Sequence, residues 1–432
     1  MNFTLPRGLR DIEPEEYDLL EKIRDAFTNT TKLFGFKLME PSSLECLETL
    51  EAKSGEAIKK EIYFFKDKSK RDIALRFDLT VGISRWVASR RDLQYPIKLG
   101  SFGSMWRYDE PQYGRYRWFY QWDVEIFGPS KADADAEIID FTYTLFKRLG
   151  IDPIAIKLGD RKIVEELIRK RTGSNNQPEI FDMLRALDKL NKKKEEEIIN
   201  EYQAKGISRA NINQILEIGK LSGDPSRILS KLEPDLENVS SRITEAIDIL
   251  NSRGVQGVQL DLSIVRGIDY YTGTVFEVFD VNTKDLGALA GGGRYDSLPE
   301  IFGRKEMGAT GVAGGVERTI LSLKKNRKTD FNRSGKIKVY VAFVGKESSH
   351  LASRITAQLR RSNILAEVEL MGRSLKKQLE VAASLNARYT IIVAPREMAS
   401  GKVVLRDMNT GNEKNQTSEE VISTLITKDK TE

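Results

Sequence analysis

The sequence is poor in the side chains that most often bind metal ions or act as general bases. Among its 432 residues there is one cysteine, Cys46, and one histidine, His350. A single cysteine excludes an intrachain disulfide and a thiolate metal cluster. A single histidine leaves no basis for a histidine-rich zinc site and argues strongly against a Ser-His-Asp triad. The chemistry must therefore depend on arginine, lysine, carboxylates and tyrosine, which suit the handling of phosphates by position and charge.

Long apolar segments are also absent. The run Val339–Val344 is one of the longest, whereas a membrane-spanning helix needs about 20 apolar residues. The first residues, MNFTLPRGLRDIEPEEY, become acidic where a signal peptide would be apolar and a transit peptide would be poor in acids. We therefore expect a cytoplasmic protein with no membrane partner.

Length and composition otherwise fit a folded protein of several domains. Hydrophobic residues make up 40% and charged residues 31% of the chain, which is ordinary for globular proteins. A chain of this length predicts two or three domains. The net charge of +5 is only a weak indication of nucleic-acid binding, because solvated surface charge would produce it equally well.

The residue pattern predicts an α+β domain over 1–323, built on a mixed, largely antiparallel sheet. An amphipathic helix is expected at 13–34, where Leu20, Ile23 and Phe27 fall on one stripe. A hairpin is expected from 62–66 and 73–77. Further strands are expected at 36–40, 96–108, 117–127, 257–263 and 274–280, and a further helix near 316–323.

Three other regions differ from this sheet pattern. Residues from about 161 to 250 are charged and favour helices, so we expect a helical insertion in the first domain. Residues 324–336, KKNRKTDFNRSGK, are polar and indicate a linker. From 337 to 432 apolar strands alternate with helical segments, which predicts a separate α/β domain.

Four segments have a local composition that suits ligand binding. The first, LRFDLTVGISR (75–85), places Asp78 and Thr80 where a strand passes into a helix. Both residue types are favoured helix caps. Taken alone, capping is a sufficient explanation for them.

The second segment, 104–128, is rich in arginine and aromatic side chains. Its polar loop is framed by Arg107, Arg115 and Arg117. Guanidinium groups bind phosphate oxygens in pairs, and aromatic rings stack on bases. The alternative is a basic hairpin with a solvated face. Alternation along the second strand favours a polar pocket, because one face carries an aromatic ring, an amide and two acids: Phe119, Gln121, Asp123 and Glu125.

The third segment, 260–279, contains a sharp break between two apolar strands. Arg266 and Gly267 make the break, and Asp269, Tyr270 and Tyr271 follow at once. An ordinary hairpin turn with a glycine would explain the break. An arginine, an acid and two phenols so close together instead indicate a ligand site.

The fourth segment joins ALAGGGRYDSL (288–298) to GATGVAGGVERTILSL (308–323). Three consecutive glycines, 291–293, would let the backbone approach a ligand closely or would form a flexible turn. In the second piece a glycine-rich strand leads into a helix that carries Glu317 and Arg318. Small residues there would admit a flat ligand beneath Arg318, or would serve tight packing of strand against helix.

In this order the four segments resemble the histidyl-tRNA synthetases, and the resemblance covers nearly the whole chain. The Arg107 and Arg318 segments are similar to motifs 2 and 3 of class II aminoacyl-tRNA synthetases, and 13–41 is similar to motif 1, the dimer element. RGIDYYTGTVFE (266–277) and GGGRYD (291–296) resemble the two signature peptides of the histidine enzymes. The region 337–432 resembles the class II anticodon-binding domain. The pattern is closer to the archaeal and eukaryotic branch than to the bacterial one.

The resemblance implies a homodimer that activates histidine with ATP and Mg²⁺ and then transfers histidine to tRNA(His). Arg107 would hold the α-phosphate and the substrate carboxylate. Arg266 would neutralise charge on that phosphate from the opposite side, a place where other class II enzymes use a metal, so no protein-bound metal is implied. Both arginines would be catalytic.

For the rest of ATP, the resemblance implies four contacts. Arg318 would stack over the adenine and pair with the γ-phosphate, while Phe119 would lie on the other adenine face. Asp109 would lie near the adenine amino group, and Arg115 would reach the outer phosphates.

For histidine, the resemblance implies that Asp78, Thr80 and Gln121 hold the α-amino group. Glu125 and Tyr271 would bind the two imidazole nitrogens, and a site of this kind rejects analogues that lack them without an editing domain. Further contacts would come from Arg266, Tyr270, Tyr295 and the backbone of 291–293.

At two positions the chain departs from the family pattern. Many members have Glu in a P-E-G-T context where this chain has Asp78 in F-D-L-T, and a longer acid is also common at Asp109. Both departures keep the charge and shorten the reach.

Three other interpretations of the sequence are considered: a regulatory subunit, another class II synthetase and a scaffolding protein. A synthetase-like regulatory subunit of histidine biosynthesis would bind histidine without charging tRNA, but it typically lacks the signature arginine and the anticodon domain. A class II synthetase for glycine, threonine or proline would share Arg107 and Arg318 but not RGIDYYTG or GGGRYD. A scaffolding protein has no use for three arginines in ligand-like settings.

Overall fold

The computed structural model describes residues 3–108, 110, 114, 116–190, 193–232, 236–265, 271–305, 307–326 and 338–429. The chain divides into two compact units, Met1–Thr329 and Asp330–Glu432. The expected linker, 324–336, lies outside the described residues from 327 onward.

A nine-stranded sheet forms the centre of the first unit, and it confirms the predicted mixed, largely antiparallel sheet. Only the β1–β5 and β7–β9 pairs are parallel. The 291–293 glycines form an internal strand of this sheet rather than a flexible turn. In spatial order the strands are β1 (Lys37–Leu38), β5 (Ile97–Trp106), β6 (Trp118–Gly128), β12 (Gly308–Gly315), β11 (Ala290–Arg294), β10 (Thr274–Asp280), β7 (Ile154–Asp160), β9 (Val258–Asp261) and β8 (Ser222–Gly223).

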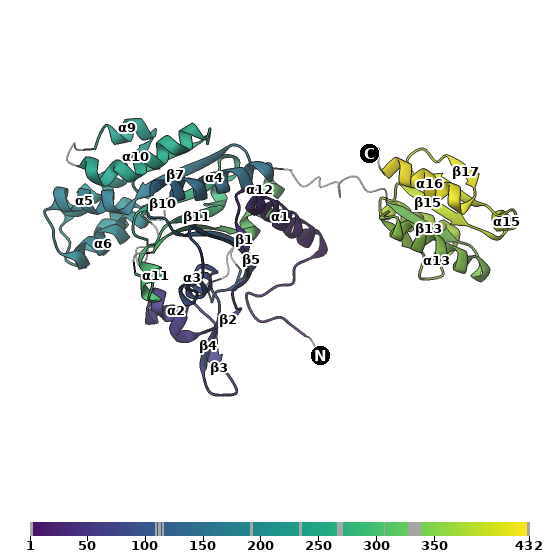
Figure 1. Cartoon of the computed structure of the whole chain (residues 1–432), viewed down its shortest axis with the longest axis horizontal. Coiled ribbons are helices and arrows are strands. Elements are labelled where there is room, and N and C mark those ends of the chain that lie inside the picture. Colours follow the sequence, from purple (N-terminus) through teal and green to yellow (C-terminus); the bar gives the residue numbers. More distant parts are fainter. Residues whose placement is uncertain are drawn as a thin grey trace. The chain divides into compact units, whose positions relative to one another are not determined.

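Helices α1 (Pro14–Leu33), α4 (Ala132–Arg148) and α12 (Val316–Lys325) pack against one another and against the sheet (Figure 1). Trp122 of β6 points to this side, and its ring centroid lies 6.0 Å from that of Phe27 and 6.2 Å from that of Phe141. Because side chains alternate along a strand, Gln121 and Asp123 point to the opposite face.

That opposite face is covered by α3 (Thr80–Ser89) and its neighbours. Leu79 and Ile83 pack there with Phe127 of β6 and Tyr295, which follows β11. The predicted hairpin at 62–66 and 73–77 is present as β3 and β4, which project from the unit (Figure 1). The smaller elements here are β2 (Leu44–Cys46), β3 (Phe64–Lys66), β4 (Asp72–Leu75), α2 (Leu47–Ser54), η1 (Glu56–Lys60), α11 (Ser297–Ile301) and η3 (Val281–Leu286).

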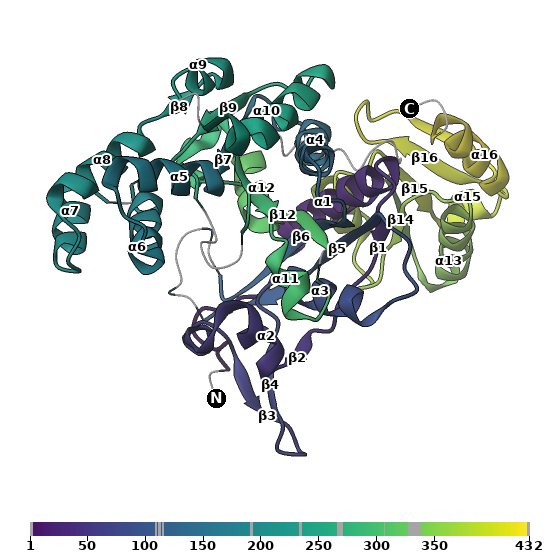
Figure 2. The same ribbon diagram turned by 60° about the vertical axis from the view of Figure 1, so that its left-hand side comes forward.

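A group of helices lies between β7 and β9 in the chain, and Figure 2 shows α6 and α8 beside α5, with α7 next to α6 and α8. Strand β7 lies between β9 and β10 in the sheet, so β9 and β10 do not pair. The two strands that flank the break at 266–267 are therefore not paired as a hairpin, and the break itself lies outside the described residues. The helices are α5 (Arg161–Thr172), α6 (Gln177–Asp188), α7 (Glu195–Gln203), α8 (Arg209–Gly219), α9 (Pro225–Leu229) and α10 (Glu237–Ser252).

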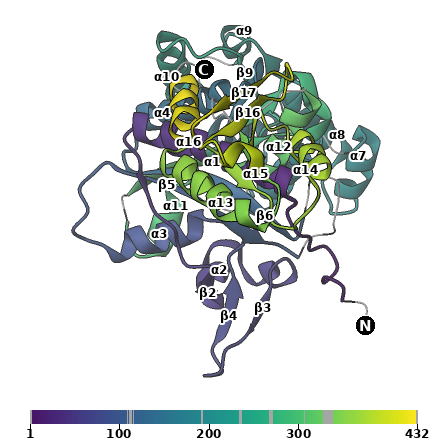
Figure 3. The same cartoon turned by 90° about the vertical axis from the view of Figure 1, so that its right-hand side faces the viewer.

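The second unit has three layers, because side chains alternate between the two faces of its sheet along β13 (Val339–Phe343). Val339 and Val341 join a core with α13 and α16, whereas Tyr340 and Ala342 join a core with α14. Figure 3 shows these helices with the strands of the second unit. Within the described part of the chain, no helix combines the length and apolar character needed to cross a membrane. The order of strands is β14 (Ala366–Val368), β13 (Val339–Phe343), β15 (Tyr389–Val393), β16 (Val403–Asp407) and β17 (Glu413–Gln416), with helices α13 (Lys346–Arg361), α14 (Leu375–Ser384), α15 (Pro395–Met398) and α16 (Ser418–Asp429).

Candidate active site

A cavity of about 340 Å³ opens in the first unit between β6, β11, β12 and the starts of α3 and α12, with Arg107 just after β5 in its wall. Residues from all four segments singled out in the sequence line it. The segments are far apart in the chain, and the sheet order brings them together. The predicted site residues that line the cavity are Asp78, Thr80, Arg107, Phe119, Gln121, Tyr271, Arg318 and Gly291.

Two arginines in the cavity wall are each fixed by a backbone carbonyl. Arg107, which follows β5, donates from Nε to the Phe77 carbonyl oxygen at 2.9 Å, and its Cζ lies 5.0 Å from the centre of the Phe119 ring. Arg318, in the first turn of α12, donates from Nη1 to the Ala288 carbonyl oxygen at 3.0 Å. Fixed guanidinium groups of this kind suit a phosphate ligand, because little ordering is left to be done when it binds.

Thr80 and Gln121 form a polar part of the wall, and a buried carboxylate behind them holds both side chains. Asp123, which is fully buried, accepts hydrogen bonds from Nε2 of Gln121 at 2.8 Å and from Oγ1 of Thr80 at 3.3 Å. The Oδ1 atom of Asp78 accepts from the Val81 N–H at 3.1 Å. Asp78 thus accepts from an N–H group in the first turn of α3, although Leu79 is the residue at the N-cap position and Thr80 is already helical. Asp78 also lines the cavity.

Glu125 and Tyr295 lie together but do not line the cavity. They are 1% and 2% exposed, and the Tyr295 hydroxyl donates to Oε2 of Glu125. Glu125 is two residues beyond Asp123 on the same face of β6. Tyr271 lines the cavity and packs against the core cluster that contains Tyr295. The backbone of Tyr271 is held in turn, since its carbonyl accepts from Nη1 of Arg161 at 2.8 Å.

The glycines of β12 show which of the two expected uses applies at each position. A Cβ atom at Gly311 would lie 1.5 Å from Oε2 of Glu125, and one at Gly314 would lie 2.2 Å from the Trp122 ring. Those two glycines make room for side chains of the protein itself. Gly315 lines the cavity and has no atom within 4 Å of a built Cβ, so it leaves open space beside Arg318.

Glu317 is a cavity residue to which the sequence assigned no role. It is 5% exposed, and both of its carboxylate oxygens accept from the Tyr120 N–H, at 2.9 and 3.2 Å. Burial raises its pKa to about 7. The signal that could have found it is its place beside Arg318 at a helix start. Asp123 was likewise placed on the correct strand face but given no role.

Four of the predicted site residues lie outside the described residues: Asp109, Arg115, Arg266 and Tyr270. Their roles stay predictions.

Comparison with known families agrees with the sequence resemblance. The family model described as histidyl-tRNA synthetase matches residues 8–319, and the anticodon-binding-domain model matches 338–428. The histidine–tRNA ligase of Pyrococcus furiosus is 36% identical over 418 residues, which cover 94% of this chain and 95% of that protein. The enzyme of the same name from Thermococcus kodakarensis is 34% identical and covers 97% of each chain.

Solved structures give the same result for the fold. Histidyl-tRNA synthetase from Nostoc sp. is similar with a TM-score of 0.81 at 25% identity, over 98% of this chain and 99% of that one. A Bacillus halodurans protein described as an ATP phosphoribosyltransferase regulatory subunit/histidyl-tRNA synthetase has a TM-score of 0.75 at 25% identity and covers 91% of this chain and 99% of its own. The predicted resemblance is confirmed: the chain belongs to the histidyl-tRNA synthetase family of aminoacyl-tRNA synthetases.

Proposed function

We propose that the protein is a histidine–tRNA ligase, which makes histidyl-adenylate from histidine and ATP and transfers histidine to the 3′ end of tRNA(His). The observation that carries the proposal is the cavity itself. In a chain of this family, the cavity joins two anchored arginines to a polar wall of Thr80 and Gln121, both of which are hydrogen-bonded to the buried Asp123.

In the first step a carboxylate oxygen of histidine attacks the α-phosphorus of ATP. A new P–O bond forms, and the bond to the β-phosphate breaks and releases pyrophosphate. Two anions must approach each other, so fixed positive charge supplies both proximity and electrostatic stabilisation. Arg107 suits this role because its Nε is held by the Phe77 carbonyl. Arg266 is the second arginine that we propose for the same phosphate.

The adenine would lie between the Phe119 ring and the Arg318 guanidinium, with the open space at Gly315 beneath it. We propose Asp109 as a partner of the adenine amino group and Arg115 as a partner of the outer phosphates. The Mg²⁺ ion that usually accompanies ATP in this family would be bound chiefly by phosphate oxygens, since among the described residues no group of three or more His, Cys, Asp or Glu side chains could hold a metal ion.

Histidine would place its α-amino group against Asp78, Thr80 and Gln121. Its imidazole would extend toward Tyr271 and Glu125, with Tyr270, Tyr295 and the β11 glycines around it. Neutral imidazole offers one N–H and one lone pair, so a carboxylate can accept from one nitrogen while a phenol donates to the other. The Tyr295 hydroxyl already donates to Glu125. When histidine binds, its imidazole N–H would be a second donor to the same carboxylate.

For the second step we propose that 1–323 is the catalytic domain, with its insertion at about 161–250, and that 337–432 binds the tRNA anticodon. Single-stranded loops suit sequence-specific RNA recognition, because their bases can be splayed out. A fragment 1–328 should still exchange pyrophosphate with histidine and charge tRNA poorly. Loss of exchange in a folded fragment would contradict this division.

We also propose a homodimer. Helix α1 and strand β1 resemble the family's dimer element, and Leu33, Leu38 and Leu44 near them are 65%, 50% and 43% exposed. A twofold interface would use the same patch on both copies. Sedimentation at micromolar concentration should give a dimer, and a monomer would contradict the proposal.

A regulatory subunit that binds histidine without charging tRNA is the second candidate, because the Bacillus halodurans neighbour is described by both names. The anticodon-binding match at 338–428 favours the ligase. Amino-acid-dependent ATP–pyrophosphate exchange, with the twenty amino acids in turn, separates the two. Exchange with histidine alone, followed by charging of tRNA(His), is expected. Histidine binding without exchange would favour the regulatory subunit.

A further inference from the structure

The segment Pro6–Arg10, which precedes α1, is held against Arg117, the residue just before β6. The Arg117 N–H donates to the Gly8 carbonyl oxygen at 3.2 Å, and Nη1 of Arg117 donates to the Arg7 carbonyl oxygen at 3.0 Å. Gly8 has φ 84°, a backbone conformation that favours glycine. The segment therefore has a defined path at this place.

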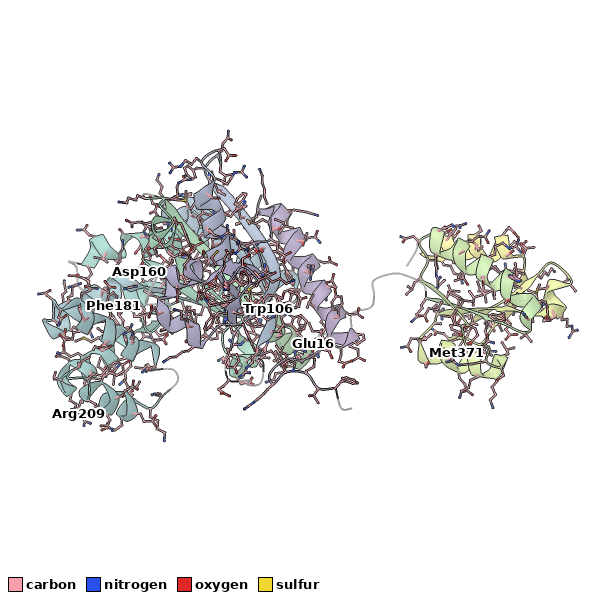
Figure 4. The ribbon with its side chains drawn as sticks, turned by 90° about the horizontal axis from the view of Figure 1, so that it is seen from below. Glu16, Trp106, Asp160, Phe181, Arg209 and Met371 are labelled. Atoms are coloured by element: carbon pink, nitrogen blue, oxygen red, sulfur yellow. The ribbon has the colours of Figure 1, made fainter. Side chains whose placement is uncertain are left out.

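The side chain of Arg10 extends from this segment into a cluster of three other side chains. Its guanidinium lies 4.0 Å from the centre of the Tyr116 ring. It forms two hydrogen bonds with the Glu16 carboxylate, at 2.9 and 2.5 Å, and lies 3.9 Å from Oε1 of Glu317. Glu16 is in the first turn of α1, which Figure 4 marks. We call Arg10, Glu16, Tyr116 and Glu317 the Arg10 cluster.

Two members of the Arg10 cluster, Tyr116 and Glu317, line the cavity beside Arg318, whereas Arg10 does not. Glu317 also holds the backbone of β6 through the Tyr120 N–H. The Arg10 guanidinium thus joins the N-terminal segment to Tyr116, which lies shortly before β6, and to Glu317 at the start of α12. The side chain of Arg10 is 20% exposed, which keeps these interactions only partly screened by water.

We infer that Arg10 is a positioning residue for the nucleotide end of the cavity, acting through Tyr116 and Glu317. The inference rests on the proposed function in one respect, which is that this end of the cavity binds ATP. Asp78, Thr80 and Gln121 at the histidine end are not members of the Arg10 cluster. Loss of Arg10 should therefore weaken the use of ATP selectively.

The test compares Arg10→Met with Arg7→Met in the full-length protein. Both changes remove one positive charge from the same segment, but the Arg7 side chain is 83% exposed and forms an ion pair with Glu110, which is 80% exposed. Since a partly buried cation–π and charge cluster is lost, we expect Arg10→Met to raise the KM for ATP in pyrophosphate exchange by about fivefold to tenfold. The KM for histidine should stay within about twofold, as should both constants for Arg7→Met.

Further variants separate positioning from general stability. Arg10→Lys keeps the charge and should recover part of the ATP effect. Arg10→Met combined with Tyr116→Leu should be little worse than the stronger single variant, because the two side chains act as a unit. Equal changes in the KM values of ATP and histidine, or a lower melting temperature with normal KM values, would overturn the inference.

Two further outcomes also test the inference: an Arg10→Met protein that does not fold, and a wild-type protein without exchange activity. If Arg10→Met does not fold, Glu16→Gln removes the ion pair that holds Arg10 and should raise the KM for ATP in the same selective way; an unchanged KM would overturn the inference. If the wild-type protein shows no exchange with histidine, the proposed function fails. The inference is then judged by equilibrium titration of ATP alone, where equal affinity of wild type and Arg10→Met would reject it.

Discussion

The two faces of strand β6 are both buried, yet they differ in chemistry. Trp122, Val124 and Ile126 form one face and pack under the helices, with at most 3% of each side chain exposed. Gln121, Asp123 and Glu125 form the other and are buried almost as deeply, with at most 6% exposed. We refer to these as the apolar face and the polar face.

Burial of apolar groups stabilises a fold, whereas burial of polar groups costs free energy unless they are hydrogen-bonded. On the polar face Gln121, Thr80 and Tyr295 supply hydrogen bonds to the two carboxylates. A buried polar face of this kind stabilises a core less than apolar side chains would, but its fixed hydrogen-bonding groups suit a binding site. We therefore expect substitutions on the apolar face to lower the free energy of unfolding, and substitutions on the polar face to change the kinetic constants for the substrates.

The largest expected effect is on the apolar face. Trp122→Ala removes a fully buried indole that contacts Phe27, Phe141 and Phe146. The free energy of unfolding should fall by about 3–5 kcal/mol, as measured by denaturant titration. At temperatures where the variant is folded, its KM for histidine should be normal. A histidine-specific defect in folded protein would break the comparison.

Arg107→Ala tests the charged wall beside the polar face. Removing one preorganised charge donor typically lowers the rate by about 10²–10³-fold, and we expect a kcat reduction of that order in histidine-dependent exchange. The unfolding free energy should change little, since the hydrogen bond from Nε of Arg107 is to one backbone carbonyl, that of Phe77. A near-normal kcat would remove Arg107 from the catalytic role.

The buried carboxyl group of Glu317, which also lines the cavity, makes stability depend on pH. Burial raises the pKa of this carboxyl from its ordinary 4.5 to about 7, so the folded protein holds the proton more tightly than the unfolded chain does. The stability that this group contributes is fully present below about pH 4.5 and is lost as the pH rises through about 7.

Glutamine has no carboxyl group to ionise. The free energy of unfolding of Glu317→Gln relative to wild type should therefore rise by up to about 3 kcal/mol as the pH increases from about 4.5 to about 7. Denaturant titrations of both proteins at several pH values measure the difference. The comparison with the variant is necessary because burial also raises the pKa of Asp160, to about 6. A difference that does not vary with pH would show that Glu317 is ionised throughout.

Much of the fold was predictable from periodicity. The alternation along 117–127 placed Gln121, Asp123 and Glu125 on one face, and the helix expected at 13–34 is α1. The sheet order was not predictable in this way, because β7 lies between β9 and β10 although it comes much earlier in the chain. Local pattern carries no information on such long-range neighbours.

The candidate site divides similarly. Arginines near glycines and aromatic rings pointed to a phosphate pocket, and Arg107, Phe119 and Arg318 do line one cavity. The use of each glycine was not predictable, because it depends on whether Trp122, Glu125 or open space lies opposite. The role of Glu317 was missed for the same reason, since its partner, the Tyr120 N–H, is distant in the chain.

The central claim is that the polar face of β6 selects histidine, and Glu125→Gln tests it most directly. The change keeps the size of the side chain and removes a charged acceptor, whose hydrogen bonds are worth about 1.5–3 kcal/mol. A matched control is Glu369→Gln in the second unit, where a buried glutamate also accepts from a buried tyrosine hydroxyl, that of Tyr340 at 2.8 Å.

Pyrophosphate exchange at varied histidine and varied ATP is the measurement. For Glu125→Gln we predict that kcat/KM for histidine falls by about 10–100-fold while the KM for ATP is nearly unchanged. Glu369→Gln should leave both constants unchanged, whatever it does to stability. A stable Glu125→Gln protein with the wild-type KM and kcat for histidine would contradict the account.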